Sequence, residues 1–104
     1  MQDCCLILTT TNNLQITEKI ASTLLELELV ACIQIDEVKS YFRWNDKISS
    51  EKEYRIVIKA KSANYSEIES IILVTHNYEL PQIIKINVDG GLQTYLEWIN
   101  QNSK

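Results

Sequence analysis

The first part of the chain shows a short apolar run followed by a wider apolar stripe. Residues Cys4–Thr9 form a continuous apolar run that ends in further threonines, which is typical of a buried strand. Asn12 and Asn13 come next and can cap a helix. Apolar side chains then recur at steps of four, four and three, at Ile16, Ile20, Leu24 and Leu27. This spacing predicts an amphipathic helix that buries one face.

The middle of the chain has the apolar period of strands. From residue 31 the apolar side chains alternate with polar ones, and the alternation continues to residue 44 with a slip at Asp36–Glu37. We interpret that slip as a β-bulge. Asn45–Asp46 then forms a tight turn, and a second strand places three apolar side chains on one face, namely Tyr54, Ile56 and Ile58. The two segments predict one long hairpin.

The last part of the chain predicts a helix, a strand and a short final helix. Ser62 can cap the helix, whose apolar stripe consists of Tyr65, Ile68, Ile72 and Thr75. This helix must end before Pro81, because the proline ring does not continue a helix. Residues Ile83–Val88 predict a fourth strand, and Tyr95–Ile99 mark the terminal helix.

The resulting order is β-α-β-β-α-β-α, and its first six elements have the ferredoxin-like order. We therefore expect an α+β fold in which two helices cover one face of a four-stranded antiparallel sheet. Residues 1–104 have the usual length of one domain.

The lengths of these elements predict an oligomer. A strand over residues 31–44 spans about 45 Å, whereas a helix of about 15 residues spans roughly 22 Å. The hairpin must therefore extend beyond the helices, with the side chains of Val38, Tyr41, Phe42, Trp44 and Ile48 on the extension. Another subunit would cover these side chains. The alternative is a sharply bent hairpin that covers itself.

The charge balance restricts the partners. The chain has 14 acidic and 10 basic residues, a net charge of −4, and its arginines are Arg43 and Arg55. Such a domain is poorly suited to nucleic acid or to anionic membranes, which require clustered cations. No segment reaches the ~18 apolar residues of a membrane span, and we expect no signal peptide. The three cysteines are an odd set without zinc-site spacing, and a secreted domain would more often pair its cysteines, so we expect a cytoplasmic protein. Its expected partner is another copy of itself.

His76 and Cys32 are the first candidate metal ligands. His76 is the only histidine and can bind a metal through imidazole, or it can hydrogen-bond the carbonyls at a helix end. Cys32 can supply a soft thiolate, or it can be a small buried apolar residue. Cys4 and Cys5 are adjacent in a strand and point to opposite faces. We expect one of them in the core and the other as a free thiol.

Other polar residues predict a pocket near a subunit junction. Glu79 lies close to Tyr78 and Pro81 and is a third candidate metal ligand. The side chains of Lys59, Tyr78 and Glu53 can line the pocket, or they can form an interfacial salt-bridge network. Four aromatic residues fit interface packing better than a stacking platform, namely Tyr41, Trp44, Tyr95 and Trp98. We find no Gly-rich phosphate loop and no nucleophile motif, so we expect no enzyme.

Four segments together resemble the CutA family of divalent-cation tolerance proteins. They cover nearly the whole chain in the same order and at similar spacing, and the motif His-x-Tyr-Glu-x-Pro is the most specific. The segments are Leu29–Cys32, Tyr41–Trp44 with Lys47–Ile48, His76–Pro81, and Tyr95–Ile99. The resemblance implies a ferredoxin-like subunit, a tight trimer built through the long hairpins, a cytoplasmic location in bacteria, and a link to copper tolerance and divalent metals.

The chain departs from the family pattern at two places. Asp36–Glu37 stands where many members have Pro-Gly. Thr9 and Thr75 stand where some members carry a Cys and a His of their proposed copper site, which leaves Cys32 and His76 from such a set.

These observations support a trimeric metal-binding tolerance protein, with copper the most favoured ion and no organic cofactor. We expect its metal site to be weak, shared between subunits and dependent on His76. One alternative is a trimeric small-ligand sensor analogous to PII signalling proteins, without catalytic activity. An unrecognised hydrolase is a third reading that no residue supports.

Overall fold

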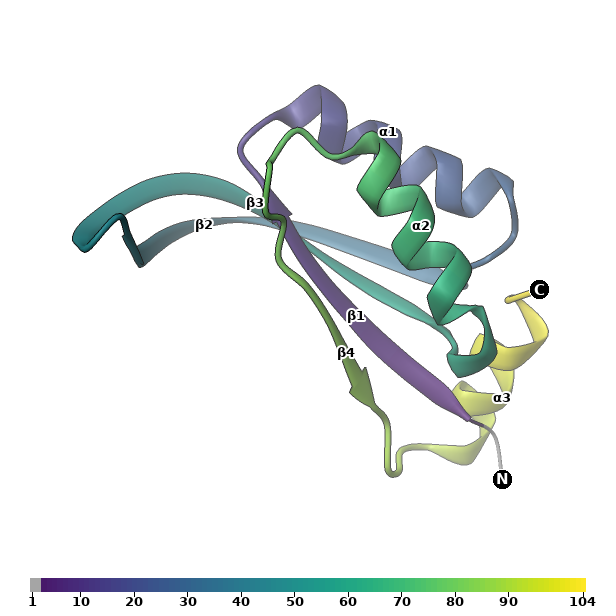
Figure 1. Cartoon of the computed structure of the whole chain (residues 1–104). Helices are drawn as coiled ribbons and strands as arrows, with labels where there is room; N and C mark the ends of the chain where they lie inside the picture. The colour runs from purple at the N-terminus through teal and green to yellow at the C-terminus, as the bar shows by residue number, and fades with distance from the viewer. Residues whose placement is uncertain (1–2) are drawn as a thin grey trace.

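The computed structural model describes residues 3–104. The elements follow one another in the order β1 (Cys4–Thr11), α1 (Leu14–Glu26), β2 (Cys32–Trp44), β3 (Lys47–Lys61), α2 (Tyr65–Thr75), β4 (Ile83–Asn87) and α3 (Gln93–Gln101). A single 3-10 turn over Ser62–Asn64 precedes α2. This is the α+β order that the hydrophobic pattern predicts (Figure 1).

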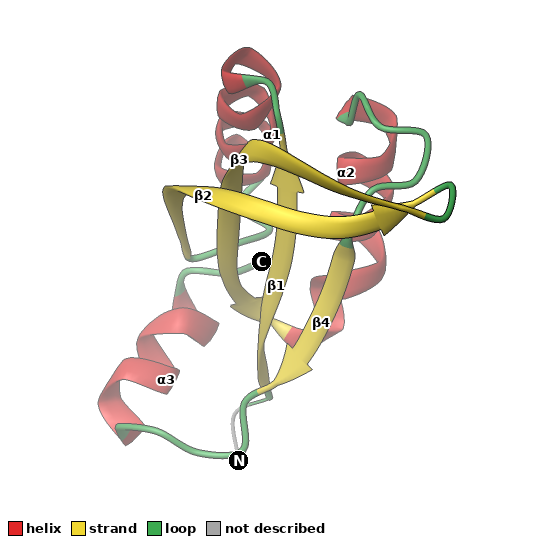
Figure 2. Cartoon of the chain, turned by 90° about the vertical axis from the view of Figure 1, so that its left-hand side faces the viewer, coloured by secondary structure: helices red, strands yellow, loops and turns green. Residues whose placement is uncertain are grey.

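The four strands form one antiparallel sheet in the order β2-β3-β1-β4. Helices α1 and α2 lie side by side on one face of it, and α3 stands apart from them at one end (Figures 1 and 2). The core lies between the sheet and these two helices. It is built from fully buried side chains that include Ile7, Ile56 and Ile58 of the sheet and Ile20, Leu24, Ile68 and Ile72 of the helices.

The β2–β3 hairpin is paired without interruption from Cys32 opposite Lys59 to Trp44 opposite Lys47. The predicted bulge at Asp36–Glu37 is therefore wrong. Asp36 forms an ion pair with its cross-strand partner Arg55 at 2.8 Å. The apolar alternation stops here because the strand leaves the core and reaches solvent, and Ile35 is already 43% exposed. No extra residue is inserted.

The hairpin ends in the predicted two-residue turn. Asn45 and Asp46 have φ values of 50° and 61°, as a type I′ turn requires. The hairpin extends well beyond the helices (Figure 1), and the chain measures 44 × 26 × 21 Å. The hairpin curves but does not cover its own apolar side chains, since Tyr41 is 69% exposed and Ile48 75%. The predicted exposed extension is confirmed for the single subunit.

The helix starts follow local polar chemistry. The Asn13 side chain accepts a hydrogen bond from the Ile16 amide at 2.9 Å, which confirms the predicted cap of α1. Ser62 does not cap α2, because residues 62–64 form the 3-10 turn and α2 begins only at Tyr65. No helix among residues 3–104 is long and apolar enough to cross a membrane.

The cysteines are all unpaired. Cys5 belongs to the core beneath the helices, as expected for one of the adjacent pair. Cys4 points to the other face and is also buried, since α3 covers it and Asn100 donates to its sulfur at 2.9 Å. Both thiols therefore have raised pKa values, with burial as the main cause.

Candidate functional site

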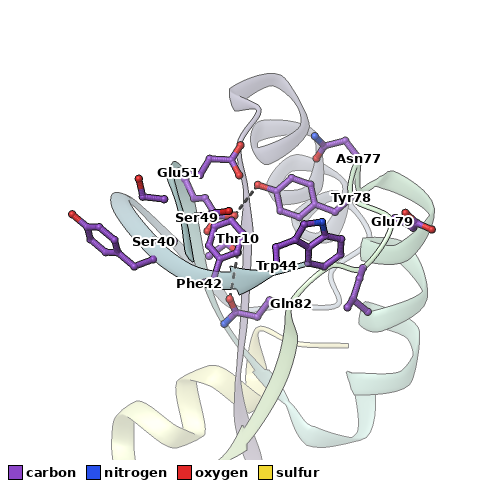
Figure 3. A pocket seen from close by; sticks show the side chains of 14 residues that line it. Thr10, Ser40, Phe42, Trp44, Ser49, Glu51, Asn77, Tyr78, Glu79 and Gln82 are labelled. Atoms are coloured by element: carbon purple, nitrogen blue, oxygen red, sulfur yellow. Dashed lines mark hydrogen bonds between the residues drawn. The ribbon is translucent and has the colours of Figure 1, made fainter. Parts of the chain in front are cut away.

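An open groove lies between the hairpin tip and the loop that joins α2 to β4, with a volume of about 1010 Å³ (Figure 3). We call it the hairpin groove. Its lining residues come from the hairpin (Ser40, Tyr41, Phe42, Trp44, Ser49, Ser50, Glu51, Glu53), from the loop (Asn77, Tyr78, Glu79, Leu80, Gln82) and from β1 (Thr10). The groove exists because the curved hairpin faces a loop that Pro81 keeps from being helical.

The charged side chains of the groove all have the same sign. They are Glu51, Glu53 and Glu79, and the lining within residues 3–104 includes no Lys, Arg or His. Glu79 is exposed, whereas Glu53 is only 7% exposed. The groove is thus an acidic region with aromatic walls.

Tyr78 and Glu53, which both line the groove, are joined by a direct hydrogen bond. The Tyr78 hydroxyl donates to Glu53 Oε2 at 2.7 Å (Figure 3). Burial of the phenol, together with this bond to Glu53, raises the pKa of Tyr78 well above its ordinary range. The phenol therefore stays protonated and remains a donor to the carboxylate across the physiological range. These two residues, both predicted to line a pocket, are thus neighbours within one subunit.

The His76 ring connects the start of the same loop to β1 through two hydrogen bonds. One ring nitrogen, Nε2, lies 2.7 Å from the Thr10 carbonyl oxygen, and Nδ1 lies 3.0 Å from the Tyr78 amide nitrogen. A carbonyl can only accept and an amide N–H can only donate, so Nε2 carries the proton and Nδ1 accepts. Both ring nitrogens are used inside the subunit. A metal could bind this ring only by displacing one of the two hydrogen bonds.

A second chain of side-chain hydrogen bonds connects the loop to the hairpin. Thr11 Oγ1 donates to Asn77 Oδ1 at 3.1 Å, and Asn77 Nδ2 donates to Asn12 Oδ1 at 2.9 Å. Asn12 Nδ2 then donates to Glu51 Oε1 at 2.5 Å. Glu51 is not among the predicted pocket residues, although its spacing of two residues from Glu53 places both on the same strand face.

Lys59 and Cys32 lie at the other end of the hairpin. They are a cross-strand pair at its base, and Lys59 is six residues from Glu53, or about 20 Å along a strand. Its ammonium donates to the Tyr95 hydroxyl of α3 at 3.1 Å. Tyr95 in turn stacks on Trp98, with ring centroids 5.7 Å apart. Within one subunit, Lys59 therefore does not join Tyr78 and Glu53.

The predicted metal ligands are not brought together in one subunit. Among residues 3–104, no group of three or more His, Cys, Asp or Glu side chains is placed to hold a metal ion. Cys32 lies at the hairpin base, Glu79 lies in the exposed loop, and both nitrogens of His76 already have partners. Closed metal sites need about four ligands and open sites about three. The donors of one subunit do not fit a complete site.

The chain is similar to known proteins over nearly its whole length. A family model described as CutA1 divalent ion tolerance protein matches residues 5–102. The divalent-cation tolerance protein CutA of Archaeoglobus fulgidus is 35% identical over 92 residues, which cover 88% of this chain and 90% of that protein. The corresponding protein of Pyrococcus horikoshii is 31% identical over 99 residues, 95% and 97% of the two chains.

The fold of the chain also matches a solved structure over nearly its whole length. The structure described as the periplasmic divalent cation tolerance protein CutA from Archaeoglobus fulgidus superimposes with a TM-score of 0.92 at 33% identity. The match covers 97% of this chain and 99% of the other. The four-stranded sheet, the three α-helices and the long hairpin are thus shared features.

Proposed function

This chain belongs to the CutA1 divalent ion tolerance family, and we propose that it acts as a homotrimer that binds a divalent metal ion. Copper is the ion that binds best, and the role is in tolerance of, or response to, metal ions. A cytoplasmic location and a single functional domain over residues 1–104 are parts of the same proposal. The family is named for tolerance of divalent ions and not for a reaction.

The observation that carries the metal proposal is the acidic groove beside His76. Glu51, Glu53 and Glu79 supply oxygen donors in a groove whose lining, within the described residues, has no cation. His76 is the first residue of the loop that carries Tyr78 and Glu79, and its Nδ1 accepts a hydrogen bond from the Tyr78 amide. Divalent copper has the highest affinity for such nitrogen and oxygen donors among the common first-row ions.

The incomplete donor set of one subunit supports a shared site. Metal binding by His76 would replace its bond to Thr10 or to Tyr78, which makes the site weak. Glu79 and the thiol of Cys32 from a neighbouring subunit are the donors that could complete it. Exposed apolar side chains on the hairpin, among them Tyr41 and Trp44, supply the surface for the assembly.

Calorimetry with Cu(II) tests this proposal. We expect weak binding by the wild type at neutral pH, weaker binding at mildly acidic pH because imidazole must be neutral to bind, and loss of binding in His76→Ala. Glu67→Gln, on the exposed surface of α2, is the matched control and should bind as the wild type does. Equal binding by His76→Ala would remove His76 from the site, and no heat from the wild type would remove the metal.

The alternative function is a trimeric small-ligand sensor without catalytic activity. The observation that favours it is the size of the hairpin groove, since small-molecule sites commonly have volumes of roughly 300–1,000 Å³. A bare metal ion leaves most of that space empty.

A further inference from the structure

Glu53 is a nearly buried carboxylate with an incomplete set of partners. Its Oε2 accepts from Tyr78, but Oε1 accepts no hydrogen bond from any residue between 3 and 104. In that range, Thr9 Oγ1 is the only side-chain polar atom that is both inaccessible to solvent and without a hydrogen-bond partner. Glu53 Oε1 also has no partner, so it must be accessible to solvent. Because Glu53 lines the hairpin groove, its free oxygen faces the open space of the groove. Carboxylates that are buried to this extent normally have a paired cation.

The cations of the hairpin do not supply that pair. Lys52 forms an ion pair with Glu37 at 2.7 Å, and Arg55 forms one with Asp36 at 2.8 Å. The three groove carboxylates remain without a cation from the described part of the subunit. Their summed charge therefore favours a positively charged occupant.

The walls of the groove fit a cation that also has an apolar part. The side chains of Phe42, Trp44 and Tyr78 line it (Figure 3). Aromatic faces attract ammonium groups within about 6 Å of the ring centre, and they also cover methylene groups. A bare divalent ion needs several donors at about 2.0–2.6 Å around one point, and one subunit offers no such group among residues 3–104, which is why the metal site proposed above is shared between subunits.

We propose that the hairpin groove binds a small organic amine, namely a short alkyl chain with a primary ammonium group. The ammonium donates to Glu53 Oε1 and the carbon chain lies along Phe42 and Tyr78. A second ammonium at the far end of the chain meets Glu51 or Glu79. In the proposed trimer, Tyr41 and Trp44 form the outer wall and meet the neighbouring subunit, whereas Glu53 and Tyr78 form the inner wall that holds the ligand.

Calorimetry with three probes of equal chain length tests the chemistry. The probes are 1,4-diaminobutane, 1-aminobutane and 1,4-butanediol, titrated at neutral pH into the full chain with a metal chelator present. We expect the diamine to bind most tightly, the monoamine at least threefold more weakly, and the neutral diol not at all. Equal binding of the diol, or no binding of either amine, would overturn the proposal.

Two variants assign the site to the groove. Glu53→Gln keeps the shape and removes the charge, and we expect at least a tenfold loss of diamine affinity. Glu79→Gln changes an exposed residue, and we expect a loss of about two- to fivefold. Glu26→Gln, on the exposed surface of α1, is the matched control and should bind as the wild type does. Unchanged binding by both groove variants would overturn the proposal.

A crystal structure of the diamine complex gives the final test. Density for the diamine between Glu53 and the aromatic walls is the expected result. A neighbouring subunit's own lysine on Glu53, in place of the diamine, would overturn the proposal. Because a chelator is present in the calorimetry, failure of amine binding leaves the Cu(II) result untouched, so the two proposals fail independently.

Discussion

At the scale of single residues, the loop after α2 depends on side chains that come from elsewhere in the chain. Its backbone is held by His76, which connects Thr10 of β1 to Tyr78. Its aromatic side chain is held by Glu53 of β3. One face of the hairpin groove is therefore placed by two hydrogen-bonding residues and not by regular secondary structure.

The Tyr78 hydroxyl should stabilise the fold through Glu53. We expect Tyr78→Phe to lower the free energy of unfolding by about 1–3 kcal/mol at neutral pH, because a buried carboxylate loses its donor. Urea unfolding measures the change. Tyr41→Phe is the control, since Tyr41 is 69% exposed, and it should have no effect. An equal loss in both variants would contradict a specific role for the Tyr78–Glu53 bond.

The same hydroxyl should also give the stability a dependence on alkaline pH. The pKa of Tyr78 is raised in the folded state, so its contribution is fully present below the unfolded value of about 10 and is lost as pH rises above it. We expect the unfolding midpoint in urea to fall above about pH 10, and to fall less steeply in Tyr78→Phe. The buried thiols Cys4 and Cys5 add their own alkaline loss, but it is the same in both proteins.

Thr9 carries the one unsatisfied and sealed side-chain polar atom of residues 3–104. On folding, the Thr9 hydroxyl loses its hydrogen bonds to water and gains no partner in the protein. Valine has nearly the same shape and lacks this hydroxyl. We expect Thr9→Val to raise the free energy of unfolding by about 1 kcal/mol, as measured by urea unfolding. Thr17→Val is the opposite control, because the Thr17 hydroxyl donates to Asn13 O at 2.9 Å and its loss should destabilise the protein.

The polar pocket was predictable from sequence only in part. Glu53 and Tyr78 were both named as pocket residues, and they are in contact. Lys59 was predicted to line the same pocket, but six residues of extended chain separate it from Glu53. Where the loop after α2 crosses the hairpin depends on tertiary packing, which apolar spacing does not encode.

At the scale of elements, the β2–β3 hairpin is the most extended feature of this subunit (Figure 1). Its two strands stay in register through every pair, including those that have left the core. The sequence pattern predicted its length and its turn, since both depend on local signals. The pattern wrongly predicted a bulge at Asp36–Glu37. A strand that passes from a buried to an exposed environment loses its apolar alternation in the same way as a strand with a bulge.

The turn should be sensitive to the residue at position 46. Asn45 and Asp46 both have positive φ, and glycine is the residue best suited to the second place of such a turn. We expect Asp46→Gly to keep or slightly raise the thermal midpoint. Asp46→Val should lower the free energy of unfolding by about 1–2 kcal/mol, because a β-branched side chain is strained there. Equal stability of both variants would show that the turn relaxes to another conformation.

At the scale of the whole molecule, the apolar surface is larger than a lone subunit needs. Large side chains on the hairpin are exposed, with Trp44 at 51% and Ile48 at 75%. The free face of the sheet adds Ile84 and Ile86, which are both more than 40% exposed. Surfaces of this kind commonly mark contacts between proteins. The trimer that we propose would cover them.

Light scattering tests this assembly directly. We expect the wild type to have three times the 12.0 kDa chain mass at micromolar concentration. Trp44→Ala should lower the stability of the assembly by roughly 3–5 kcal/mol per site if Trp44 becomes fully covered, and should dissociate it on dilution. Val74→Ala, which changes an 85% exposed residue of α2, is the control. A monomeric wild type, or equal dilution curves for both variants, would contradict the proposed interface.

The two-residue turn at Asn45–Asp46 has a consequence for how the chain folds. The pairs nearest this turn join residues that are only a few positions apart, so the hairpin can zip from its tip on a timescale of about 1–10 μs. The pairing of β1 with β4 joins Cys5 to Asn87, and closing so long a loop is slow. We therefore expect the β2–β3 hairpin to form before β1 pairs with β4. The surface proposed for assembly would then exist before the core is complete, and subunits could meet while they are still folding.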